Sequence, residues 1–171
     1  GDNNNISGVF IGNQTGRPAI NVPGDKNNFT DVTIADSELD PAIKVDGDGT
    51  TLDHVNVVGN KGQGITLNGN NATIKNNKFE GNDGTAITVN GNGTSVQGTT
   101  VSGNNGTAIV VNGDRATFSD NTVSGNNGTA MEVNGNGAVV EDTEFSENEG
   151  SGIVINGNGN TVDGNGKYGF L

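Results

Sequence analysis

The residues best suited to chemistry are four carboxylates in the last third of the chain. Asp120 and Asp142 are 22 residues apart, and so are Glu141 and Asp163. If the chain repeats with that period, the four side chains gather at one corner of the fold. Ca²⁺ prefers such oxygen clusters, and carboxylates without a cation would repel one another. We therefore treat the four residues as calcium-ligand candidates or an acid/base group, with solvated turn carboxylates as the alternative.

The single histidine is the second candidate for chemistry. His54 falls one repeat after Asp31, and Asp53 precedes it in the sequence. An Asp–His dyad can serve as a general base. Asp31 and His54 are therefore the catalytic candidates, and the alternative is a histidine at a surface corner.

An exposed strand face that processes polysaccharide would normally carry several acids together with Arg or Lys. One column of predicted outward positions does not show this set: Asn21, Lys44, Thr66, Thr88, Val110, Glu132 and Val154. The chain also has no tryptophan, and most of its phenylalanines fall at core positions. These features disfavour an enzyme.

Composition and charge limit the partners. The 171 residues carry 8 basic and 20 acidic side chains, and the net charge is −12. Nucleic acid and anionic membranes are poor partners for such a surface, while cations and polysaccharide stay open. No apolar run is long enough for a membrane-spanning helix, and the absence of cysteine excludes disulfides and thiolate metal sites. We expect no required cofactor, with calcium as the one candidate.

A 22-residue period organises these side chains. Gly84–Gly91 and Gly106–Gly113 have nearly the same sequence, and the apolar positions within each unit keep one phase. Three short strand-like runs separated by Gly/Asn turns recur in every unit, which is typical of a solenoid. The phase extends over the whole chain and predicts one domain, residues 1–171, of about seven coils with three short strands each.

The phase has one irregularity near the N-terminus. Ile20, Phe29 and Ile34 precede their counterparts by 23 residues, so one extra residue must lie between Ile34 and Ile43. We expect an altered turn there.

Asparagine marks the predicted corners. Asn-Gly usually indicates a two-residue hairpin, but repetition with a fixed phase favours parallel stacking, so we interpret Asn90-Gly91 as a coil corner with a left-handed residue. Equivalent asparagines should then form hydrogen-bonded ladders. A further column drifts from apolar to polar, and its direction stays open: Val32, Val55, Asn77, Thr99, Asn121, Thr143 and Asn165.

The repeat resembles a known family. The pattern Gly-x-x-Ile-x-Val-x-Gly, followed by Val and by Asn-x-Val-x-Gly-Asn, runs through residues 62–165. It is similar to the repeats of right-handed parallel β-helices of the pectate-lyase-like superfamily. The resemblance implies an all-β, right-handed parallel β-helix. It leaves function open, because the superfamily includes lyases, hydrolases, epimerases, tailspikes and adhesins.

Two functions of different classes follow. The favoured one is a non-enzymatic scaffold, either an idealised or engineered β-helix or the stalk of a secreted or cell-surface protein. The alternative is a carbohydrate-binding or polysaccharide-active lyase, hydrolase or epimerase fragment. The chain begins in mid-repeat without a signal peptide, which indicates a mature fragment, an excised core or an engineered chain. A natural protein of this kind would be extracellular or on the cell surface.

The ends of a solenoid need cover, because each terminal coil lacks a neighbour. We expect Tyr168, Phe170 and Leu171 to fold under the last coil. The alternative is an open end that allows self-association by stacking.

Overall fold

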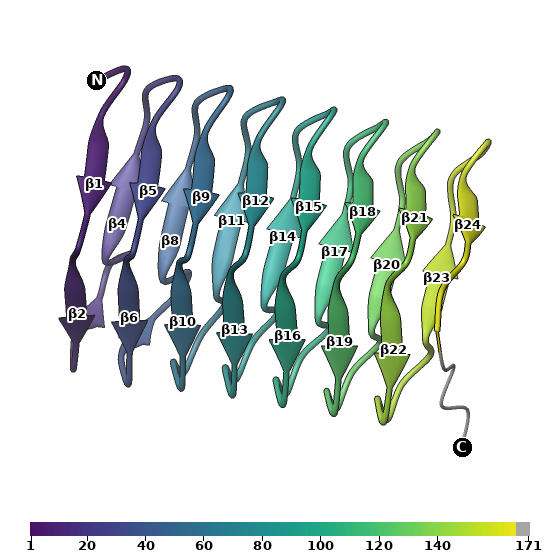
Figure 1. The fold of residues 1–171 in the computed structure, drawn as a ribbon. Coiled ribbons are helices and arrows are strands. Elements are labelled where there is room, and N and C mark those ends of the chain that lie inside the picture. Colours follow the sequence, from purple (N-terminus) through teal and green to yellow (C-terminus); the bar gives the residue numbers. More distant parts are fainter. Residues whose placement is uncertain (167–171) are drawn as a thin grey trace.

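The computed structural model describes residues 1–166, and every regular element in that range is a β-strand. In Figure 1 the strands of the near side run downward, those of the far side run upward, and the chain advances steadily from its N-terminus. This path is a right-handed coil. The predicted right-handed parallel β-helix of about seven coils, with three strands per coil, is therefore confirmed.

Three parallel sheets run along the solenoid, and the chain visits them in the order sheet 1, sheet 2, sheet 3. Sheet 1 contains β4 (Ile20–Val22), β8 (Ile43–Val45), β11 (Ile65–Leu67), β14 (Ile87–Val89), β17 (Ile109–Val111), β20 (Met131–Val133) and β23 (Ile153–Ile155). Sheet 2 contains β1 (Asn5–Ser7), β5 (Asn28–Thr30), β9 (Thr51–Asp53), β12 (Thr73–Lys75), β15 (Ser95–Gln97), β18 (Thr117–Ser119), β21 (Val139–Glu141) and β24 (Thr161–Asp163). Sheet 3 contains β2 (Phe10–Gly12), β6 (Thr33–Ala35), β10 (Asn56–Val58), β13 (Lys78–Glu80), β16 (Thr100–Ser102), β19 (Thr122–Ser124) and β22 (Glu144–Ser146).

The register of the sheets reproduces the sequence period. Ile87 pairs with Ile109, and Val101 pairs with Val123, so like residues stack over like residues. Each strand of these sheets has only three residues, and their side chains point alternately into the core and out to solvent. β-branched residues suit this arrangement. The apolar ladders thus build a continuous axial core.

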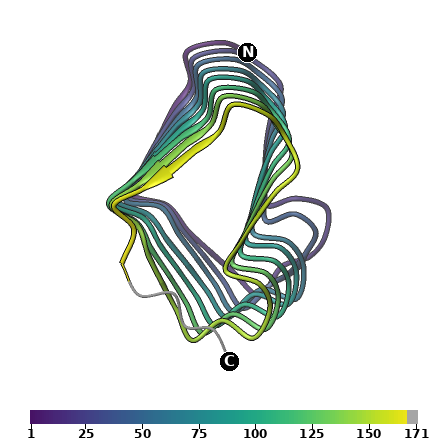
Figure 2. The same ribbon diagram turned by 90° about the vertical axis from the view of Figure 1, so that its right-hand side faces the viewer.

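One corner is enlarged in the first two coils. Ile20 pairs with Ile43, 23 residues later, whereas Ile43 pairs with Ile65 at the regular spacing, which places the extra residue as predicted. The structure shows a second extra residue in the preceding coil, because Ile11 pairs with Ile34 at the same 23-residue spacing. The enlarged corner carries the small sheet of β3 (Thr15–Gly16) and β7 (Glu38–Leu39), which bulges from the solenoid in Figure 2. We call residues 12–19 and 35–42 the lobe.

The core is narrow and fully packed. Met131 is completely buried between the ladder partners Ile109 and Ile153, as the phase predicts. The column whose direction the sequence left open points inward: Asn77 and Asn121 are buried. Asn121 Oδ1 accepts from the Thr99 backbone N–H at 3.0 Å, which satisfies the buried amide. The asparagines of this column are tolerated in the core because Asn77 and Asn121 hydrogen-bond to the backbone of neighbouring coils, and Thr143 Oγ1 donates to the Glu141 carbonyl of its own coil at 3.0 Å.

Left-handed residues bend the chain at all three corners, but not all at the predicted positions. Asn90-Gly91 does not contain the left-handed residue of its corner. Gly93 does, with φ of 67°, and in the next coil Arg115 takes that place with φ of 56°. Gly91 is required for a different reason, since a Cβ there would overlap the carbonyl group of Gly69 in the preceding coil.

The predicted cap of Tyr168, Phe170 and Leu171 lies outside the described residues.

Candidate functional site

His54 lies at the corner between sheets 2 and 3, and its nearest acid is the preceding residue. The imidazole Nδ1 is 2.8 Å from Asp53 Oδ1, and 60% of the His54 side chain is exposed. Asp31 occupies the same corner one coil earlier, where its backbone N–H donates to the Asp53 carbonyl at 3.2 Å. Within residues 1–166 no ion pair joins Asp31 to His54. The side-chain pair at this corner is therefore Asp53–His54 rather than the predicted Asp31–His54.

Asp53 holds several neighbours at once. Its Oδ2 is 3.1 Å from Lys75 Nζ, and its Oδ1 accepts from Asn76 Nδ2 at 3.2 Å. Burial opposes ionisation of Asp53, but the hydrogen bonds from Asn76 and Lys75 outweigh it and lower the pKa of the carboxyl group. Asp53 is therefore a stable anion and a poor proton acceptor, which makes it a partner that orients His54 rather than a base.

Backbone geometry accounts for the residue types at this corner. His54 has φ of 54°, Asp31 also 54° and Asp120 55°. The left-handed region favours Gly, Asn, Asp and His among the common residues. The whole column obeys this rule: Gly8, Asp31, His54, Asn76, Gly98, Asp120, Asp142 and Gly164. Histidine and aspartate thus occur here for the same steric reason as the glycines.

The four calcium candidates lie on neighbouring coils at this corner. Glu141 pairs with Asp163 across β21 and β24, while Asp120 and Asp142 are consecutive left-handed residues of the corner. Among the residues that the structure describes, no three acidic, histidine or cysteine side chains converge in a way that could hold a metal ion. Calcium binding here stays a prediction.

A third set of carboxylates joins coils at the corner between sheets 1 and 2. Asp25 Oδ1 accepts from the backbone N–H of Asp48 at 2.8 Å, and Asp48 Oδ1 accepts from that of Asn70 at 2.7 Å. Asn92 and Asp114 continue the column in the same way, at 2.7 Å. Each side-chain oxygen therefore satisfies a backbone donor of the next coil, a task that Asp and Asn perform equally well.

A buried asparagine ladder follows the corner between sheet 3 and the next strand of sheet 1. Asn104 Oδ1 accepts from both the backbone N–H and Nδ2 of Asn82, each at 2.9 Å. Asn104 Nδ2 donates onward to Asn126 Oδ1 at 2.9 Å and also to the Phe79 carbonyl at 3.2 Å. The predicted ladder is confirmed, and it is fully buried. Its members are Asn60, Asn82, Asn104, Asn126 and Asn148.

A second, exposed ladder follows the corner between sheets 1 and 2, and it runs in the opposite direction. Asn90 Nδ2 donates to Asn68 Oδ1 of the preceding coil at 2.8 Å, and Asn68 Nδ2 donates to Asp46 Oδ1 at 2.6 Å. Lys44 also contacts Asp46, at 2.7 Å. The hydrogen bonds from Lys44 and then from Asn68 lower the pKa of Asp46. The ladder thus ends on a stabilised anion. Its members are Asn68, Asn90, Asn112, Asn134 and Asn156.

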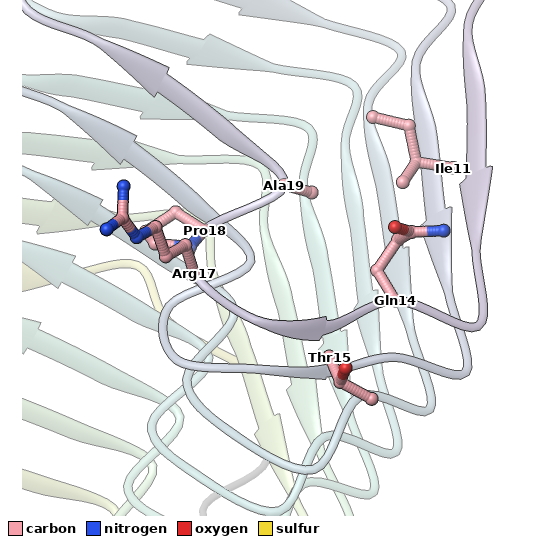
Figure 3. A pocket seen from close by; sticks show the side chains of 6 residues that line it. All are labelled: Ile11, Gln14, Thr15, Arg17, Pro18 and Ala19. Carbon is pink, nitrogen blue, oxygen red and sulfur yellow. The ribbon is translucent and has the colours of Figure 1, made fainter.

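The lobe contains a hollow of about 510 Å³ that the sequence did not reveal. Figure 3 shows Ile11 and Gln14 on one side of it, with Arg17, Pro18 and Ala19 along the segment that leads to β4. No ion pair is described for Arg17 within residues 1–166, and its guanidinium extends away from Ile11. A polar rim with an apolar wall suits a small neutral or anionic molecule. The signal available in the sequence was the longer spacing from Ile11 to Ile20.

Comparison with known proteins agrees with this architecture. The family model described as "Right handed beta helix region" matches residues 18–167. The chain belongs to this family of right-handed β-helix proteins. The match identifies a fold that carries many functions and no specific reaction.

Two other comparisons add nothing on function. No curated protein matches the sequence. Among solved structures, a trypsin-treated form of QnrB1, a plasmid-mediated fluoroquinolone resistance protein, aligns over 89% of this chain and 92% of its own, with 8% sequence identity and a TM-score of 0.25. A likeness at that level supports no argument about this chain.

Within residues 1–166 no helix is long and apolar enough to cross a membrane.

Proposed function

We propose that this protein is a non-enzymatic β-helix scaffold, either an idealised or engineered solenoid or the rigid stalk of a secreted or cell-surface protein. One observation carries the proposal: the carboxylates at the corner between sheets 1 and 2 form hydrogen bonds from coil to coil. Asp48 accepts a backbone N–H of the following coil, and Asp46 terminates an asparagine ladder. Such residues are engaged in structure and are not free to bind a substrate.

The left-handed corner extends this argument to the catalytic candidates. The place of His54 is taken by Asn76 in the next coil and by Gly98 in the one after. A position that accepts Gly, Asn, Asp and His in one molecule is selected by its backbone conformation. We infer that His54 and Asp120 fill a steric requirement and do not form a reaction centre.

The test uses residues that the chain itself supplies at the same corner. His54→Asn and Asp120→Asn keep a residue that adopts positive φ and remove the base or the carboxylate. We expect both variants to keep the wild-type melting temperature. We also expect them to match the wild type in product formation from a panel of polysaccharides. The assay is the formation of unsaturated or reducing products from acidic and neutral polysaccharides. Turnover by the wild type that either variant loses would refute the scaffold proposal.

The hollow in the lobe favours a second candidate, carbohydrate binding. Gln14, Thr15 and Arg17 offer amide, hydroxyl and guanidinium groups beside the apolar surface of Ile11 and Pro18. Sugars present the same mixture of hydroxyls and apolar ring faces. A glycan array with wild type, with Arg17→Ala and with Lys26→Ala as a control tests this candidate. Binding lost only in Arg17→Ala supports it, and an array without binding rejects it.

A further inference from the structure

Two stretches of nine residues are identical in sequence and stand one coil apart. Thr100–Ala108 and Thr122–Ala130 both read Thr-Val-Ser-Gly-Asn-Asn-Gly-Thr-Ala. Each contains an Asn-Gly pair with an exposed asparagine and a half-buried glycine, Asn105-Gly106 in one and Asn127-Gly128 in the other. The local chemistry of the two pairs is therefore the same, and any difference in reactivity must come from the neighbouring coils.

Asn-Gly pairs are prone to deamidation because glycine leaves the attacking nitrogen unhindered. The backbone nitrogen of the glycine attacks Cγ of the asparagine, a new N–Cγ bond forms and the nitrogen loses its proton to solvent. Nδ2 takes up a proton from solvent, the Cγ–Nδ2 bond breaks and ammonia leaves, so that the ring becomes a succinimide. Water opens the ring to aspartate or isoaspartate. The step needs the side chain to rotate until Cγ reaches the nitrogen, so its rate depends strongly on geometry.

The first asparagine is held at both ends of its amide. Asn105 Nδ2 donates to Asp83 Oδ1 at 2.8 Å, and Asn105 Oδ1 accepts from Asn127 Nδ2 at 2.9 Å. Rotation toward Gly106 must break both hydrogen bonds. Although a donor at Oδ1 also polarises the carbonyl group, a side chain fixed at two points rarely reaches the attack geometry.

The second asparagine is held at one end only. Asn127 Nδ2 donates to Asn105 Oδ1, but the next rung of this column is Glu149, whose backbone N–H donates to the Asn126 carbonyl at 2.9 Å. An ionised carboxylate has no proton to donate, so it cannot hold Asn127 Oδ1. No hydrogen bond is described for the backbone N–H of Gly106 or Gly128, so both nucleophiles are equally available within the described part of the chain.

We propose that Asn127-Gly128 is a deamidation site built into the solenoid. It lies where the hydrogen-bonded column Asp83–Asn105–Asn127 ends and Glu149 takes the next position. The identical pair Asn105-Gly106 is protected because the Asn105 amide is hydrogen-bonded to both of its neighbours in that column. Conversion of Asn127 to aspartate removes the donor to Asn105 and adds a negative charge beside Glu149. Isoaspartate also lengthens the backbone at a residue whose N–H bonds to the Asn104 carbonyl at 2.9 Å. Deamidation at one site therefore loosens the contact between two coils.

The experiment compares the two sites within one molecule. The folded protein is aged at mildly alkaline pH and digested with trypsin, which separates the sites because Arg115 lies between them. Fragment-ion mass spectrometry then locates aspartate and isoaspartate. We expect Asn127 to deamidate about tenfold to a hundredfold faster than Asn105, the scale that misplaced reacting atoms produce. In denaturant the two rates should become equal.

Two variants separate the ladder from simple charge. Glu149→Asn adds a side-chain donor on the rung above Asn127, and it should lower the rate at Asn127 toward that of Asn105. Glu147→Asn removes the same charge two residues away at a left-handed position that suits asparagine, and it should leave the rate unchanged. Equal rates at the two sites in the folded wild type, or equal effects of the two variants, would overturn the proposal.

Discussion

Replacement of Asn104 by alanine tests the buried ladder most directly. The side chain accepts two hydrogen bonds from Asn82 and donates to Asn126, Phe79 and Ser102, all in a fully buried environment. Alanine leaves the backbone N–H and one amide hydrogen of Asn82 without acceptors. A buried unsatisfied donor costs about 1–3 kcal/mol, so Asn104→Ala should lower the free energy of unfolding by about 4 kcal/mol.

The control is the same substitution on the exposed ladder. Asn112 also joins two coils, through Asn90 at 2.8 Å and Asn134 at 2.9 Å, but water can replace its amide. Surface substitutions of this kind change stability by less than about 0.5 kcal/mol. A third variant, Asn104→Ser, copies Ser37, which holds the equivalent rung in an earlier coil, and it should fall between the two alanine variants.

Guanidinium chloride denaturation measures these differences, with an unchanged m-value showing that the same structure unfolds. Hydrogen exchange at the backbone N–H of Asn82 provides a local readout, and its protection should fall most in Asn104→Ala. If Asn104→Ala and Asn112→Ala lower stability equally, burial does not set the strength of the ladders and the reasoning is wrong.

Four further predictions follow from the structure. Thr94 has a buried hydroxyl that finds no hydrogen-bond partner within residues 1–166, while both of its neighbours in the stack are alanine, so Thr94→Ala should keep or raise the free energy of unfolding, by up to about 1 kcal/mol, in a denaturant titration. The lowered pKa of Asp46 means that its stabilisation is complete above the unfolded pKa of about 4 and is lost as pH falls through the folded value, so Asp46→Asn should reduce the loss of melting temperature between neutral and acid pH. If the predicted calcium site forms, calcium should raise the melting temperature of the wild type and not of Asp142→Asn, and equal values with calcium and with a chelator reject the site. Deletion of residues 167–171 should lower the melting temperature and cause association that grows with concentration in sedimentation experiments, whereas unchanged behaviour rejects the predicted cap.

Much of the candidate site was visible in the sequence as positions, but not as contacts. The repeat placed Asp31 at the corner of His54, 23 residues earlier, and Glu141 opposite Asp163, 22 residues earlier, and the pairing of β21 with β24 agrees with the second placement. It could not show that His54 would contact Asp53, because that contact depends on the rotamer of a side chain at a left-handed bend. Nor could it show the hollow in the lobe, which two extra residues create only when their coils stack.

The sequence by itself determined the fold. Repetition of apolar residues and glycines in one phase permits only in-register stacking, since any shift would place polar residues such as Asn82 out of line with their partners. The tertiary structure decided which of two similar asparagine columns is buried and which faces water, because inside and outside depend on the direction in which each corner bends. It also decided the direction of the column containing Asn77, whose polar residues enter the core because their amides reach backbone groups of adjacent coils.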